Sequence, residues 1–63
     1  MEAFTQEELS EALRAIESTI RKCEKVKPKL AEGTSQHTLL VRRIRALEIS
    51  AALIRREMGG EME

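Results

Sequence analysis

Apolar residues in the second half of the chain recur at alternating spacings of three and four. At about 100° per residue they fall in one stripe along a helix over residues 35–58. The stripe consists of His37, Leu40, Ile44, Leu47, Ala51, Ile54 and Met58. This spacing is typical of a helix that packs lengthwise against another helix.

The same segment carries a second apolar stripe on an adjoining face, separated from the first by Arg43 and Ser50. Its members are Leu39, Ala46, Ile49 and Leu53. A helix that packs against a single neighbour needs only the first stripe. We therefore interpret the second stripe as an interface between copies of this chain.

The first half of the chain has a single apolar stripe, which predicts a helix that begins at Thr5. The stripe consists of Leu9, Leu13, Ile16, Ile20, Cys23, Lys27 and Leu30, flanked by the small residues Ala12, Ala15 and Thr19. Small flanking side chains allow another helix to approach closely. Pro28 interrupts the pattern because it lacks an amide hydrogen and its ring presses on the Glu24 carbonyl. The helix either ends near Lys27 or kinks and continues to about Ala31. The place of Leu30 on the stripe favours the kink.

The start of this helix carries two signals that agree. Thr5 and Glu8 have the spacing of a capping box, in which each side chain bonds the backbone amide of the other residue. Phe4 and Leu9 then occupy the two positions of a hydrophobic staple. Further along, Glu17 and Arg21 are spaced for an ion pair across one turn.

The link between the two helices is short. Residues 32–34 form the turn, Gly33 suits a left-handed backbone position, and residues 59–63 form a tail after the second helix. A link of this length forces the helices to lie antiparallel. The sequence thus predicts one all-α domain over residues 1–63, a helical hairpin that self-associates into a four-helix bundle dimer or a higher hairpin oligomer.

Size supports association, because the chain has only 63 residues. Cores this small rarely supply more than about 3–5 kcal/mol of stability without disulfides, metal or oligomerisation.

The single cysteine, Cys23, excludes an internal disulfide. We interpret it as a small core residue, with an inter-subunit disulfide or redox thiol as the alternative. His37 is expected to pack at the edge of its stripe. A metal site would need Cys23 and His37 from two chains, and their levels in the hairpin are offset.

Charge is sorted by position although the formal net charge is zero. Residues 21–45 hold eight Lys or Arg against two Glu, a net charge of +6, and the remainder holds three Arg against nine Glu, a net charge of −6. Two uses of the basic turn end compete: pairing with the acidic end of a second copy, or contact with an anionic partner such as nucleic acid. The candidate anion contacts are Lys25, Lys29, Arg42, Arg43 and Arg45.

The residues give little support for catalysis, for cofactor or metal binding, or for membrane insertion. There is no nucleophile–base pair in context and no glycine-rich phosphate loop, so we expect no enzyme, no cofactor and no metal. The start of the chain lacks a signal-peptide layout and no apolar run approaches membrane-spanning length. We expect a cytoplasmic homodimer or tetramer that serves as a structural or protein-interaction module with an unidentified protein partner. Nucleic-acid binding is the alternative, and we expect no membrane association.

Overall fold

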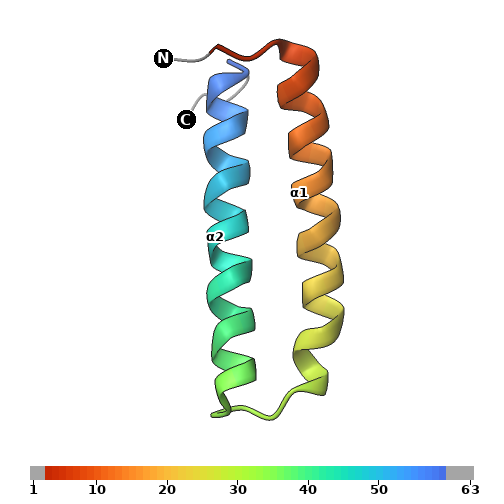
Figure 1. Cartoon of the computed structure of the whole chain (residues 1–63), viewed down its shortest axis with the longest axis vertical. Coiled ribbons are helices and arrows are strands. Elements are labelled where there is room, and N and C mark those ends of the chain that lie inside the picture. The colour runs from red at the N-terminus through yellow and green to blue at the C-terminus, as the bar shows by residue number, and fades with distance from the viewer. Residues whose placement is uncertain (1–2, 60–63) are drawn as a thin grey trace.

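The structure is a computed structural model, and it describes residues 3–59. Two helices, α1 (Gln6–Val26) and α2 (Ser35–Glu57), lie antiparallel and pack along their length (Figure 1), and the short 3₁₀ helix η1 (Lys27–Lys29) follows α1. No strand occurs in the part of the chain that the structure describes. The predicted all-α hairpin is therefore confirmed. The predicted tail beyond Gly59 lies outside the described residues.

The capping box at the start of α1 is formed. The Thr5 amide donates to Glu8 Oε1 at 3.0 Å, and the Glu8 amide donates to Thr5 Oγ1, also at 3.0 Å. Thr34 caps α2 in a similar way, because its Oγ1 accepts a hydrogen bond from the His37 amide at 3.2 Å. Each cap satisfies amides that have no partner within the first turn of their helix.

The α-helix ends at Val26, and the chain continues directly as the 3₁₀ helix η1 to Lys29, before it becomes extended at Leu30. Pro28 has no amide hydrogen for the Glu24 carbonyl. The chain tightens into η1, where the Leu30 amide donates to the Lys27 carbonyl at 3.1 Å, and Leu30 itself is extended. Leu30 is nevertheless half-buried, so it still packs against the hairpin although it lies outside the helix.

Two glycines adopt the left-handed backbone conformation outside the helices. Gly33, with φ of +88°, lies in the turn before α2, and Gly59, with φ of +83°, follows Met58, the C-cap residue of α2. No atom would meet a Cβ within 4 Å at either position. The requirement for glycine is therefore conformational and does not come from crowding.

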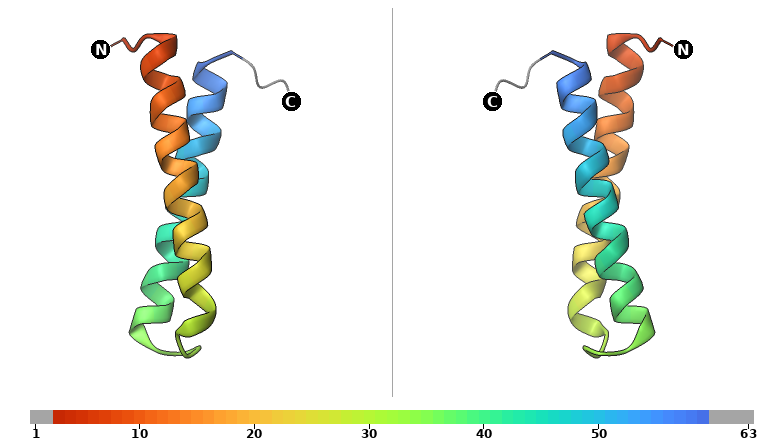
Figure 2. Two further views of the ribbon diagram at one scale, coloured as in Figure 1. Left: turned by 90° about the vertical axis from the view of Figure 1, so that its right-hand side faces the viewer. Right: turned by 90° about the vertical axis from the view of Figure 1, so that its left-hand side faces the viewer.

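The core lies between the apolar stripe of α1 and the first stripe of α2, and it is thin. Among the described residues only Leu9, Leu40, Ile44 and Ala51 are buried. The other members of both stripes are half-buried, apart from Lys27, which is exposed. The helices lie side by side in Figure 1 and cross in Figure 2. The radius of gyration is 14.0 Å, whereas a compact domain of this length would have about 10.6 Å.

Two polar contacts join the helices at long range. Arg55 Nη2 donates to Glu17 Oε2 at 2.6 Å, and Gln6 Nε2 donates to the Met58 carbonyl at 3.4 Å. The predicted pairing of Glu17 with Arg21 within α1 is wrong, because Glu17 pairs across to α2. A spacing rule within one helix cannot anticipate a partner that only the packing of the hairpin supplies.

Candidate interaction surface

The second stripe of α2 is exposed, as an interface between copies requires. Leu39 is 57% exposed, Leu53 is 54% exposed and Ile49 is 47% exposed, and Ala46 is exposed as well. Exposure of leucine and isoleucine side chains to water is unfavourable when they gather in one patch on one face of a molecule.

Helical geometry at about 100° per residue places most of this stripe on one flank of the α2 core stripe. On α1 the same geometry places small and apolar residues on one flank of the core stripe and Glu17 on the other. Together these two flanks make up what we call the apolar face. It comprises Ala12, Ala15, Thr19 and Val26 of α1, and Leu39, Ala46, Ser50 and Leu53 of α2.

The ion pair between Glu17 and Arg55 shows that the two apolar flanks lie on the same side, because both charged residues lie on the other flank of their helices. Ala12 of α1 borders a hollow together with Ile54 of α2. Leu30, which follows α1, borders another hollow together with Leu39 of α2. One side of the hairpin therefore carries the apolar and small residues, with Glu8 and Arg43 at its two ends, and the other side carries the Glu17–Arg55 pair.

Ile49 departs from the rest of the second stripe. It follows Leu40 by nine positions and so lies about 180° from it around the helix axis. It points away from α1 and stands at the outer margin of the apolar face. The face is thus formed by Leu39, Ala46 and Leu53 with the small residues of α1, which the sequence identified only as allowing close approach.

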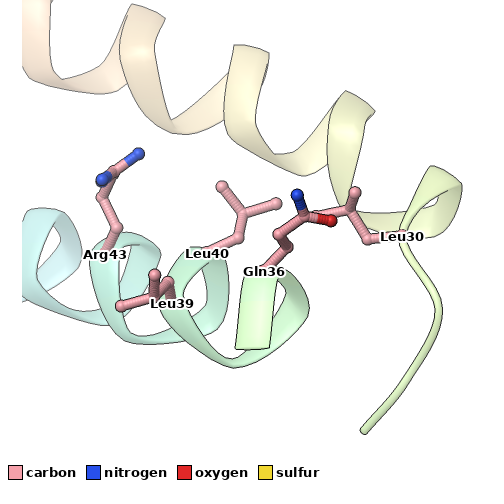
Figure 3. A pocket seen from close by; sticks show the side chains of 5 residues that line it. All are labelled: Leu30, Gln36, Leu39, Leu40 and Arg43. Carbon is pink, nitrogen blue, oxygen red and sulfur yellow. The ribbon is translucent and has the colours of Figure 1, made fainter. Parts of the chain in front are cut away.

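Two hollows lie on the apolar face, one at each end. The terminal hollow, about 240 Å³, is lined by Phe4, Glu8, Leu9, Ala12 and Ile54. The turn hollow, about 330 Å³, is lined by Leu30, Gln36, Leu39, Leu40 and Arg43 (Figure 3). In Figure 3, Leu40 points toward α1, and Leu30 reaches the same space from the segment after η1. The apolar pattern alone did not identify these hollows, because each needs residues from both arms of the hairpin.

Two of the five candidate anion contacts, Arg43 and Arg45, lie on different sides of the hairpin. Arg43 and Arg45 lie about 160° apart around α2. Arg43 borders the turn hollow, while Arg45 donates to Glu48 at 3.4 Å on the charged side. Lys25, Lys29 and Arg42 are exposed. The residues share the turn half of the hairpin but face in several directions.

Cys23 and His37 are both half-buried on their stripes, and Cys23 is a free thiol. Over residues 3–59, no three His, Cys, Asp or Glu side chains are arranged to hold a metal ion. Neither α1 nor α2 has both the length and the apolar composition needed to cross a membrane.

Comparison with known proteins adds no relative. The chain has no match among family models and no significant match among curated proteins or solved structures.

Proposed function

We propose that this chain is a non-enzymatic homo-oligomeric module with a structural or protein-interaction role. Its simplest form is a two-fold dimer in which two hairpins join through their apolar faces and form a four-helix bundle. The observation that carries the proposal is the exposure of Leu39 and Leu53 on a face to which α1 contributes small side chains.

The dimensions of the hairpin support a dimer. A stable interface buries about 800 Å² on each partner. The hairpin measures 40 Å by 24 Å in the plane of its two helices, as viewed in Figure 1, so one side of it is wide enough for an interface of that size. The small residues Ala12, Ala15 and Thr19 permit the helices of a second copy to approach closely. Burial of a leucine side chain contributes about 1.5–3 kcal/mol, so Leu39 and Leu53 would add several kcal/mol to a thin core.

The alternative is a regulator that binds nucleic acid through the basic turn end. The excess of Lys and Arg between residues 21 and 45 favours it. The divergent directions of Arg43 and Arg45 and the pairing of Arg45 with Glu48 weigh against it, because a duplex backbone presents its phosphates along one surface. We therefore rank self-association first.

Leu53→Glu tests the proposal, with Val41→Glu as the matched control. Both replace an exposed aliphatic residue of α2 by glutamate, but Val41 lies on the charged flank. We expect Leu53→Glu to convert the dimer to a monomer in analytical ultracentrifugation while circular dichroism shows retained helix. Val41→Glu should leave the sedimentation coefficient unchanged. A wild-type chain that sediments as a well-folded monomer at all concentrations would overturn the proposal.

A salt titration with duplex RNA and duplex DNA tests the alternative. A phosphate-binding surface loses affinity steeply as salt rises, with a slope set by the number of neutralised phosphates. On the self-association proposal, neither duplex binds appreciably at low salt. Binding with a steep salt dependence, lost in the double variant Arg42→Ala/Arg43→Ala, would establish the nucleic-acid function.

A further inference from the structure

Phe4 and the turn hollow lie at opposite ends of the same face of the hairpin. We propose that the turn hollow of one copy receives Phe4 of a second copy, in a two-fold dimer whose turns point in opposite directions. This inference rests on the proposed self-association and adds to it the orientation of the partner and the side chain that it contributes.

Phe4 is placed to serve as an anchor. It is the only aromatic residue of the chain, and it is 55% exposed. The capping box between Thr5 and Glu8 holds the backbone directly after it. Phe4 also borders the terminal hollow with Leu9 and Ala12, so its ring lies on the apolar face. An exposed aromatic side chain on a held backbone loses little further conformational freedom on binding.

The turn hollow suits an aromatic ring. Leu30, Leu39 and Leu40 supply apolar surface to this open hollow of about 330 Å³, and Gln36 and Arg43 also border it. Burial of such a side chain removes about 150–250 Å² from water. Arg43 stands at the rim, where its guanidinium group would meet the face of the incoming ring.

Charge selects the same orientation. Residues 21–45, the turn half of the hairpin, have a net charge of +6, and the other described residues hold three Arg against six Glu, a net charge of −3. When the turns point in opposite directions, each basic end lies beside an acidic end, whereas turns at the same end would bring like charges together. In the first arrangement Glu8, which borders the terminal hollow with Phe4, also approaches Arg43 of the partner subunit.

Photo-crosslinking from position 4 tests the orientation. The variant Phe4→p-benzoyl-phenylalanine keeps an aromatic ring at the site. We expect a covalent dimer whose crosslinked peptide lies within residues 30–43. A single hairpin cannot form this crosslink, because position 4 and the turn lie at opposite ends of a molecule 40 Å long. The matched control Val41→p-benzoyl-phenylalanine, on the charged flank, should give no covalent dimer.

Equilibrium sedimentation of Phe4→Ala supplies the second readout. We expect the dimer dissociation constant to rise at least about tenfold, as for an aromatic interface anchor, while Val41→Ala leaves it unchanged. A dimer that crosslinks from position 4 only to terminal residues of its partner, or that keeps its affinity in Phe4→Ala, would overturn this arrangement and leave self-association standing. A monomeric wild type would overturn both.

Discussion

Ile44 and Ile49 show how position alone gives one residue type two roles within α2. Ile44 is buried against α1, while Ile49, five positions later, points outward and is 47% exposed. A buried isoleucine contributes through lost water contact and through close packing with its neighbours. An outward one contributes little to the folded hairpin.

Truncation of these two residues should therefore have unequal effects. We expect Ile44→Ala to lower the free energy of unfolding by about 2–5 kcal/mol, because it removes transfer energy and leaves a cavity. Ile49→Ala removes the same atoms from the surface and should change it by about 0.5 kcal/mol or less. Urea denaturation followed by circular dichroism gives both values. Equal losses in the two variants would show that Ile49 is buried in the assembled protein.

Polar contacts at single residues contribute less. Glu17 and Arg55 form a close ion pair, but both side chains remain more than a third exposed to water. Exposed pairs of this kind contribute about 0.2–1 kcal/mol. The pair therefore adds little to the stability of the hairpin.

The ends of the elements decide the shape of the hairpin. Pro28 ends α1 because it cannot donate to the Glu24 carbonyl, and η1 then brings Leu30 to the turn hollow. The cap at Thr5 was predictable from the sequence because a capping box joins residues three positions apart. The course beyond Pro28 was not, because Leu30 meets the apolar surface equally well in a kinked helix and in an extended segment.

Gly33 provides a test at the level of the turn. We expect Gly33→Ala to destabilise the hairpin by about 1–2 kcal/mol, since a Cβ disfavours its φ of +88°. Gly33→Asn should cost less, because asparagine tolerates the left-handed conformation better. Thermal unfolding ranks the two variants. Because no neighbouring atom lies within 4 Å of a Cβ placed there, equal losses for alanine and asparagine would contradict a conformational origin.

At the scale of the whole molecule, a thin core coexists with an apolar face and with opposite charges at its two ends. Four buried side chains are few for the residues from 3 to 59. The residues on the apolar face extend that core if a second copy covers them. The charged ends do not add much energy individually, but they distinguish one orientation of the partner from the other.

The dependence of association on salt should separate the contribution of the charged ends from that of the apolar face. Between about 0.1 M and 1 M salt the Debye length falls from about 10 Å to about 3 Å, so attraction between opposite ends is screened. We expect the dimer dissociation constant to rise over this range while the dimer persists, because burial of the leucines is not weakened by screening. Sedimentation equilibrium at several salt concentrations measures this. An affinity that does not change with salt would mean that the charged ends take no part in the association.

The sequence by itself determined the elements and the face that each turns toward the other. Stripes with helical spacing, the capping box at Thr5 and a short glycine-containing turn depend on neighbours within about one helical turn, so they can be found from the chain alone. Only the tertiary structure decided that Ala12 and Leu39 lie on the same side, that Glu17 pairs with Arg55, that Ile49 points away from α1, and that each end of the apolar face is hollowed. Each of these features depends on how one helix is rotated and displaced against the other. That rotation is set by side-chain packing across the hairpin, between residues far apart in the chain.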